Sequence, residues 1–187
     1  AECQPAWLLQ CAQMGAVFAR GRYGIVEPRV GLLSIGEEST KGNPLVKETH
    51  ALLTEAGALD RAGARFIGNV EGRDIMTADI DVVVTDGFTG NVALKTLEGG
   101  MKALVKAVLE ALGTTDVADK AFESLLPLYS TLDPDNTGGA MLLGVDGVCI
   151  ISHGSSSATA MVNATRVALE MVEADVVGHL RAAVAPA

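Results

Sequence analysis

The chain has 187 residues, of which 49% are hydrophobic and 20% charged, and its formal net charge is −9. The hydrophobic content excludes a disordered chain, and the length is sufficient for a sizeable core. The negative charge excludes a general nucleic-acid surface, and it would oppose an acidic partner unless lysines and arginines gather locally. No apolar run reaches membrane-spanning length and nothing resembles a secretory signal, so we expect a soluble, cytoplasmic protein.

Three cysteines are scattered along the chain, at Cys3, Cys11 and Cys149. An odd set without CxxC spacing is typical neither of a disulfide framework nor of a zinc site. We therefore expect these residues to be buried as small hydrophobic side chains.

Apolar periodicity and turn residues predict an α/β chain. The hydrophobic residues are mainly alanine, valine and leucine, a mixture typical of helices packed on a parallel sheet. The pattern predicts strands over about 29–35, 65–70, 81–85 and 145–151, and helices over about 5–20, 44–56, 89–112, 117–132 and from the serines after 153 to about 184. No internal repeat or linker separates them, so we expect no domain boundary within 1–187.

The stretch 81–95 is the centre of the prediction. Its β-branched run indicates a buried parallel strand, which Asp86 and Gly87 end. Thr89 or Asn91 can then cap a long helix, whose first backbone N–H groups would face an anion. The alternative is an ordinary connection between a strand and a helix.

Each of the four predicted strands ends in a loop rich in glycine and polar residues. The loops are 36–43, 71–74, 86–91 and 153–156. Because the carboxyl ends of parallel strands share one edge of a sheet, these loops can converge on one crevice. This convergence is the functional signal in the sequence.

The loop 86–91 has neither the GK[ST] of a Walker loop nor the GxGxxG of a dinucleotide site, so a smaller anion fits it better. Lys95, one turn after Asn91, can bring a positive charge to the same edge, although an exposed helix lysine is an equally good interpretation. His153 can donate to an oxyanion or act as an acid or base, and a structural role is the alternative.

Covalent catalysis finds no support, because Ser155 is not in GxSxG and no base adjoins a cysteine. Acidic loop residues could gather a metal, but no ligand spacing is diagnostic, and ion pairs with Lys41 and Arg73 are the more economical interpretation. These acidic residues are Glu37, Glu38, Glu71, Asp74 and Asp86. We expect direct electrostatic catalysis on an anionic reactant, without a metal or a cofactor.

Five motifs in one order resemble the bacterial phosphate acyltransferase family, PlsX. They are VGLLSIGEESTKGN at 30–43, FIGNVEGRDI at 66–75, DGFTGNVALK at 86–95, GGAMLLG at 138–144 and HGSS at 153–156. Ser34 stands where the family often has asparagine, and Thr137 and Met141 stand where it more often has tyrosine and proline. The resemblance implies that inorganic phosphate attacks the thioester of acyl carrier protein, giving acyl phosphate for phospholipid synthesis.

The resemblance also implies an architecture like that of the isocitrate and isopropylmalate dehydrogenases, with a mostly parallel sheet between helices on both faces. It implies a homodimer and a loose, peripheral contact with the inner face of the membrane. The helix 117–132 is the best candidate for that contact, although a dimer interface or core explains it equally well. Family members carry a further amino-terminal half, so we expect 1–187 to be the carboxy-terminal portion of a PlsX-like catalytic domain.

Motifs and loop chemistry together give a hypothesis for the site. Lys95, Asn91, His153 and Arg73 are the expected catalytic residues, which bind phosphate and the developing thioester oxyanion. The expected substrate-binding residues are Asp86, Gly87, Thr89, Gly90, Lys41, Glu38, Glu71, Ser155 and Ser156. Because the carrier protein is acidic, we expect Lys102 and Lys106 to form a local basic patch that docks it.

Two other functions remain open at the level of sequence. One is a phosphate acetyltransferase-like enzyme, which uses coenzyme A thioesters and needs a nucleotide pocket. The other is a truncated, non-catalytic half-protein that pairs or binds a carrier without turnover.

Overall fold

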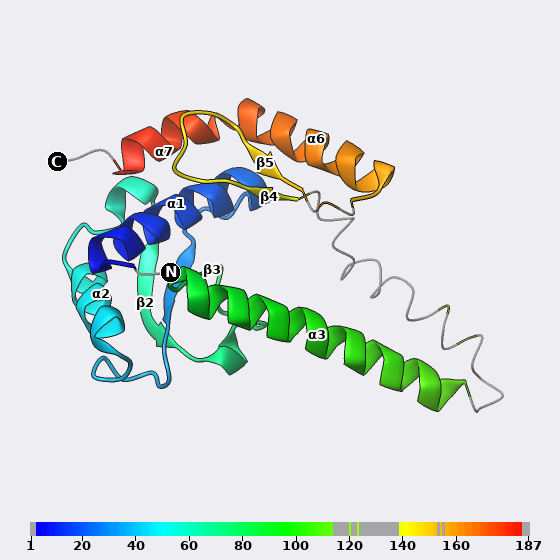
Figure 1. Cartoon of the computed structure of the whole chain (residues 1–187). Helices are drawn as coiled ribbons and strands as arrows, with labels where there is room; N and C mark the ends of the chain where they lie inside the picture. The colour runs from blue at the N-terminus through cyan, green and yellow to red at the C-terminus, as the bar shows by residue number, and fades with distance from the viewer. Residues whose placement is uncertain are drawn as a thin grey trace. The chain divides into compact units, whose positions relative to one another are not determined.

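Figure 1 shows the computed structural model of the chain, which describes residues 3–113, 120, 123, 139–152, 154 and 156–184. These residues divide into two compact units. The first unit comprises the described residues within 1–90, 142–149 and 169–187, and the second comprises those within 91–141 and 150–168.

A three-stranded parallel sheet is the centre of the first unit. It contains β1 (Arg29–Leu33), β2 (Arg65–Val70) and β3 (Val82–Val84) in the order β2-β1-β3. The middle strand is the most buried, with Val30 0% and Leu32 1% exposed. The chain packs tightly here, because a Cβ atom at Gly31 would lie 2.6 Å from a methyl group of Val70. The α/β class and the three strands expected between residues 29 and 85 are thus confirmed.

Two helices form a layer on this sheet, α1 (Pro5–Tyr23) and α2 (Pro44–Thr54), and they also pack on each other. Each has a proline in its first turn, where a missing N–H does no harm. The side chain of Asn43 accepts a hydrogen bond from the Val46 N–H at 2.9 Å and so caps α2. The helix α1 packs closely on β3, since a Cβ atom at Gly15 would lie 2.7 Å from a methyl group of Val82.

Shorter elements complete the first unit. Two 3-10 turns, η1 (Asp60–Ala62) and η2 (Gly72–Asp74), precede and follow β2, and α7 (Val176–Val184) packs on α1 and η1. The predicted terminal helix is divided into α6 (Ala158–Glu173) and α7. The division lies at Asp175, whose φ of 45° no helix can contain.

A bidentate ion pair between Arg29 and Asp81 stabilises the start of the sheet. The Arg29 guanidinium donates to both carboxylate oxygens of Asp81, at 2.8 and 3.0 Å, and the Arg29 backbone N–H donates to one of them at 2.8 Å. The hydrogen bonds from the Arg29 guanidinium have the largest effect on the pKa of Asp81. Together with the backbone hydrogen bond, they hold that pKa below its ordinary value, although burial acts in the opposite direction. The contact ties the beginnings of β1 and β3 together.

The second unit contains most of α3 (Gly87–Leu112), most of α6, and two short antiparallel strands, β4 (Ala140–Met141) and β5 (Ile150–Ile151). The prediction of a strand over 145–151 in the parallel sheet was therefore wrong. The Leu142 N–H donates to the Cys149 carbonyl at 2.8 Å, so most of that apolar run lies in a hairpin connection. The helix predicted over 117–132 and the loop 133–138 lie outside the described residues, apart from Lys120 and Glu123.

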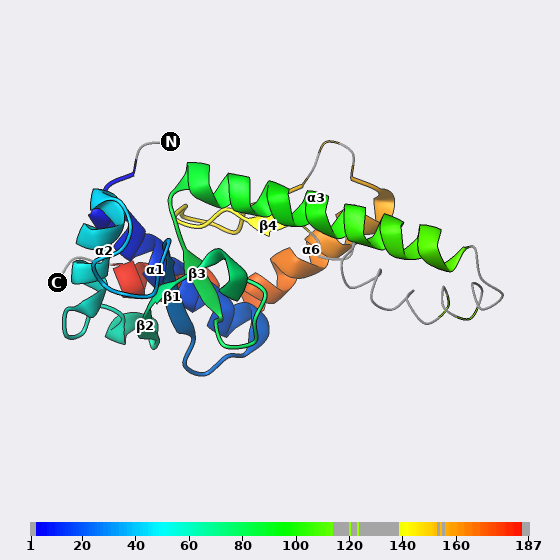
Figure 2. The ribbon, with the colours of Figure 1, turned by 90° about the horizontal axis from the view of Figure 1, so that it is seen from below.

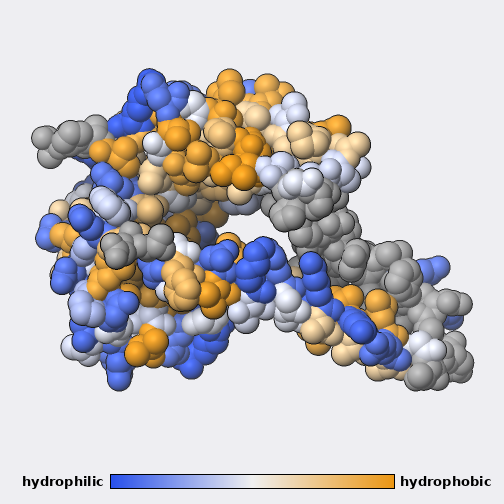
Figure 3. Space-filling model, viewed as in Figure 1, coloured by the Kyte–Doolittle hydropathy of each residue, from blue (hydrophilic) through white to orange (hydrophobic). Residues whose placement is uncertain are grey.

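The surface carries several apolar side chains. No residue of α3 is buried, and Figure 3 shows hydrophobic side chains beside hydrophilic ones along α3 and α6. Cys11 and Cys149 are exposed and Cys3 is half-buried, so the expectation of buried cysteines was wrong. Cys11 lies just off the buried stripe of α1 that contains Leu8 and Ala12. Across the described residues, no helix is long and apolar enough to cross a membrane.

Candidate active site at the carboxyl edge of the parallel sheet

Three of the four predicted loops meet at the carboxyl edge of the parallel sheet, where β1, β2 and β3 end. Backbone and side-chain contacts join the first two, since the Ser34 N–H donates to the Val70 carbonyl at 2.8 Å and the Asn69 amide donates to the Glu38 carbonyl at 2.9 Å. Figure 2 shows the three strands from below, with their order fixed by the pairing of β1 to both neighbours. The loop after β5 does not follow a strand of this sheet.

Arg73 lies among three carboxylates. Its guanidinium is 2.6 Å from Glu71, 3.1 Å from Glu37 and 3.8 Å from Asp74. The negative charge of Glu71 and the hydrogen bond to Glu37 raise the pKa of Arg73, so the side chain stays protonated. The expected ion pairing of Arg73 with the acidic loop residues is confirmed. Arg73 joins the loops after β1 and β2, and its 70% exposed side chain remains accessible to a ligand.

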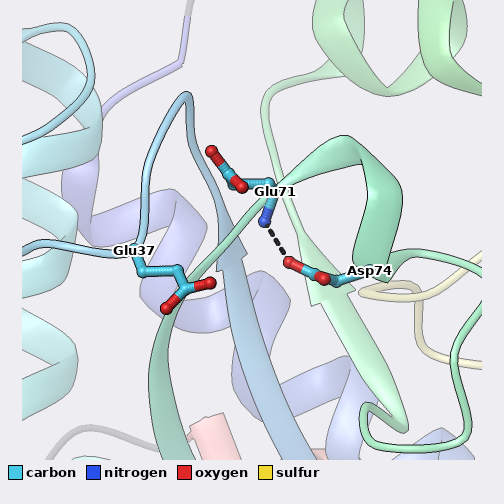
Figure 4. A group of neighbouring side chains, drawn as sticks. All are labelled: Glu37, Glu71 and Asp74. Carbon is cyan, nitrogen blue, oxygen red and sulfur yellow. Dashed lines mark hydrogen bonds between the residues drawn. The ribbon is translucent and has the colours of Figure 1, made fainter.

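Two of the three carboxylates, those of Glu71 and Asp74, are held by the loop after β2. The Glu71 N–H donates to Asp74 at 2.8 Å, and the two residues form a reciprocal capping box around η2, as Figure 4 shows in part. Oxygen atoms of Glu37, Glu71 and Asp74 lie within 4.8 Å of one another, close enough to share a cation. Arg73 already supplies positive charge to all three, so the group is explained as an ion-pair network.

Asp86 caps α3. One oxygen of its carboxylate accepts hydrogen bonds from the N–H groups of Phe88 and Thr89, at 2.9 and 3.0 Å, and the other accepts from the Thr89 hydroxyl at 2.5 Å. Burial raises the pKa of Asp86, but the hydrogen bonds from Thr89 and Phe88 together exceed that effect and hold the pKa below its ordinary value. The carboxylate is therefore ionised at neutral pH.

This cap differs from the one predicted, in which Thr89 or Asn91 capped the helix. Thr89 instead donates to the capping residue, because the Asp86 carboxylate can accept several N–H groups at once. The first N–H groups of α3 are thus already paired, and a bound anion would have to compete with Asp86. Gly90 belongs to the same turn, where a Cβ atom would lie 3.0 Å from a methyl group of Thr85.

Glu38 and Lys41 lie together in the loop after β1. The Lys41 N–H donates to the Glu38 carbonyl at 2.9 Å, and a Cβ atom at Gly36 would lie 2.8 Å from the Lys41 side chain and 3.0 Å from the Glu38 carboxylate. Gly36 therefore leaves the space in which these two exposed side chains lie.

The predicted residues on α3 from Asn91 onward belong to the second unit. Lys95 forms an exposed ion pair with Glu98 at 2.9 Å, Lys106 lies 3.7 Å from Glu110, and Asn91 and Lys102 are exposed. In the same unit, the Ser156 hydroxyl lies 3.1 Å from that of Ser152. His153 and Ser155 lie outside the described residues.

A cavity of about 280 Å³ opens beside the Asp86 turn, between α1, the start of α2 and the ends of β1 and β3. Polar groups at its wall are Ser34, Asn43, Thr85, Asp86 and Thr89, and the rest of the lining is mainly leucine, isoleucine and valine. The sequence analysis did not assign Ser34, Asn43 or Thr85 to a site. Ser34 and Thr85 directly follow β1 and β3 in the structure, but the predicted strands 29–35 and 81–85 included them, so no signal set them apart as loop residues.

The fold and the site define an α/β protein whose parallel strands end in a cluster of charged and glycine-rich loops, the usual place for a ligand in such sheets. The chain belongs to the family of fatty acid synthesis proteins, whose model matches residues 1–179. It is 46% identical over 185 residues to a phosphate acyltransferase of Elusimicrobium minutum. The aligned region covers 97% of this chain and 52% of the relative. It is also 46% identical to a phosphate acyltransferase of Thermus thermophilus (97% of this chain, 55% of the relative) and 44% identical to one of Pelotomaculum thermopropionicum (98% and 53%).

These matches confirm the family resemblance found in the five motifs. The chain spans about half the length of the curated relatives it matches.

Proposed function

We propose that this protein takes part in acyl transfer from the thioester of acyl carrier protein to inorganic phosphate, and so supplies acyl phosphate for phospholipid synthesis. The observation that carries the proposal is the 46% identity, over 97% of the chain, to proteins named phosphate acyltransferase. The cluster of strand-end loops supports it, because charged groups from separate loops meet there.

The reaction needs few protein groups. A phosphate oxygen attacks the thioester carbonyl carbon, a C–O bond forms, and the C–S bond breaks after the tetrahedral intermediate. The carrier leaves as a thiolate that takes up a proton. Because phosphate is already an anionic nucleophile at neutral pH, positioning and charge stabilisation can supply most of the catalysis.

Arg73 is the best placed of the described cations to bind phosphate. Its side chain is 70% exposed, and its guanidinium is within 4 Å of three carboxylates. A planar guanidinium can donate two hydrogen bonds to a phosphate at once. Lys95, Asn91 and His153 complete the proposed set of catalytic residues, and Lys41 adds charge at the first loop.

The partner in this proposal is an acidic carrier protein that meets Lys102 and Lys106 on α3. Both side chains are exposed, and the Glu110 ion pair of Lys106 is long and open to solvent at 3.7 Å. Exposed pairs of this kind exchange easily for pairs with a partner, because they contribute little to stability. The proposed assembly is a homodimer with a peripheral membrane contact.

One assay tests the proposed function directly. The purified chain is incubated with inorganic phosphate and either acyl carrier protein thioester or acyl coenzyme A, and hydroxylamine traps any acyl phosphate as a hydroxamate. Product from the carrier thioester supports the proposal. Product from coenzyme A alone indicates a phosphate acetyltransferase-like enzyme. Carrier binding without product indicates a non-catalytic half-protein.

A further inference from the structure

We propose that the cavity beside Asp86 holds the acyl group of the substrate, with the carbon chain against its apolar wall and the acyl carbonyl oxygen on the Ser34 hydroxyl. This inference rests on the proposed acyl transfer, for which the chain must bind an acyl group. It assigns that group to one cavity and to one hydrogen-bond donor.

The lining fits a hydrocarbon chain. The cavity has a volume of about 280 Å³, near the lower end of the range for small-molecule sites, and it opens to solvent at the carboxyl edge of the sheet. Its apolar wall consists of Leu8, Leu32, Leu33, Ile35, Leu45 and Val46. Leu8 and Leu32 are each only 1% exposed, so the inner wall belongs to the core of the first unit and its shape is fixed by packing.

The charge at the mouth of the cavity decides between the two halves of the reaction. Asp86 is the one ionisable residue of the lining, and three hydrogen bonds keep its carboxylate ionised. A phosphate ion in the same space would be repelled by this charge at short range. A neutral acyl chain is not repelled, so the cavity suits the acyl half of the reaction.

The Ser34 hydroxyl is a polar group of the lining that is buried without a hydrogen-bond partner. Its oxygen is buried and has no hydrogen-bond partner, although the Ser34 backbone N–H is paired with Val70. Leaving a hydroxyl unpaired is costly, and a carbonyl oxygen of a bound acyl group would accept a hydrogen bond from it. The same donor would stay useful as negative charge develops on that oxygen.

Gly42 lies next to this hydroxyl and has no side chain to crowd it. A Cβ atom at Gly42 would lie 3.1 Å from the Ser34 oxygen and 2.7 Å from a methyl group of Val46. Its φ of +95° also favours glycine. A side chain at this position would close the cavity at the point where the carbonyl is proposed to lie.

The test measures binding of neutral thioesters, without turnover. The probes are the acetyl and decanoyl thioesters of N-acetylcysteamine, and titration calorimetry on the chain gives their affinities. Val46→Trp fills the apolar part of the cavity, and Ser34→Ala removes the donor. Lys47→Trp is the matched control, because Lys47 is exposed on the same helix and outside the lining. Circular dichroism and thermal unfolding check that each variant folds.

The proposal expects the decanoyl probe to bind the original chain more tightly than the acetyl probe. Val46→Trp should weaken decanoyl binding about tenfold or more, while Lys47→Trp leaves it unchanged. Ser34→Ala should weaken both probes by roughly two- to tenfold, the worth of one hydrogen bond. If Val46→Trp unfolds, the proposal is still tested by the affinities of Ser34→Ala and by the difference in affinity between the decanoyl and acetyl probes.

Equal affinity of a folded Val46→Trp variant and the original chain for the decanoyl probe overturns the cavity assignment, and so does failure of the original chain to bind that probe. The hydroxylamine assay separates this from the proposed function. Acyl phosphate formed by variants with unchanged thioester binding leaves the function standing and removes the cavity. Chain-length-dependent binding without acyl phosphate keeps the cavity and removes the function.

Discussion

The hydroxyl of Thr89 donates a hydrogen bond to the carboxylate of Asp86 across 2.5 Å, and this pair fixes how α3 begins after β3. The same carboxylate accepts the N–H groups of Phe88 and Thr89. A loop that the sequence suggests for an incoming anion is therefore already occupied by a negative charge of the protein. The proposed phosphate site is therefore at Arg73, in the loop after β2.

Replacing Asp86 should destabilise the first turn of α3. Asp86→Ala should lower the free energy of unfolding by about 1 kcal/mol, since that is the usual worth of a helix cap. Asp86→Asn should cost less, because asparagine also caps well and loses only the charge. Urea unfolding at neutral pH measures both. Equal stability of Asp86→Ala and the original chain would contradict the capping role.

The difference in stability between the original chain and Asp86→Asn should depend on pH in a predictable direction. The pKa of Asp86 is lowered on folding, so its charge contributes stability that is fully present above the ordinary aspartate pKa of about 4 and is lost as the pH falls through the folded pKa. The stability difference between the original chain and Asp86→Asn should therefore be constant near neutral pH and shrink below about pH 4. A difference that grew in acid would mean that the pKa is raised.

A metal ion should be able to replace Arg73 as the cation that neutralises Glu37, Glu71 and Asp74. Arg73→Ala leaves Glu37, Glu71 and Asp74 close together without the cation that now touches all three. Calcium should then raise the melting temperature of Arg73→Ala and leave that of the original chain unchanged, because three clustered carboxylates are suitable ligands. Arg73→Lys, which keeps a positive charge, serves as the control and should respond to calcium less than Arg73→Ala.

Arg73→Ala should also weaken phosphate use if acyl transfer is confirmed. The expected result is a higher KM for phosphate with little change in the KM for the thioester, because the guanidinium is proposed to contact phosphate alone. Steady-state rates of hydroxamate formation at varied phosphate give both constants. An increase confined to the thioester KM would move Arg73 to the acyl side of the site.

The sequence predicted the local elements well where the signals were local. The β-branched run at Val82–Val84 is a strand, and the helix predicted from residue 44 begins at Pro44. The apolar run ending at Ile151 has equally good strand residues, but it lies in a hairpin with β4 because strand pairing depends on a distant segment. Composition cannot choose that partner.

In the candidate site, too, local features could be predicted from the sequence and long-range ones could not. Ion pairing between Arg73 and nearby acids could be predicted, since opposite charges in adjoining loops attract. The cap of α3 was assigned to the wrong residue because Asp86, Thr89 and Asn91 are all good capping types within six residues. The cavity could not be predicted, because its wall is drawn from α1, β1, α2 and the turn after β3.

Lys95 is proposed to act on the substrate, and its mutation should show this without disturbing the fold. Lys95→Ala should lower the rate of acyl-phosphate formation at least about tenfold, since a single well-placed charge is worth that much in a transition state. The unfolding free energy should change by about 0.5 kcal/mol or less, because the ion pair with Glu98 is exposed. Glu98→Gln is the matched control, as it breaks the same pair but keeps the lysine. Normal turnover in Lys95→Ala would remove Lys95 from the site.

Charge reversal on α3 tests the proposed docking of the carrier. Lys102→Glu and Lys106→Glu should each weaken binding of acyl carrier protein and reduce its dependence on salt, because an acidic partner is attracted mainly by exposed positive charge. Lys47→Glu changes the net charge of the chain equally but lies on α2, so it separates a local effect from a general one. Affinities at low and moderate ionic strength supply the comparison. If Lys47→Glu weakens binding as much as the two α3 variants do, the attraction is one of overall charge and α3 is not the docking face.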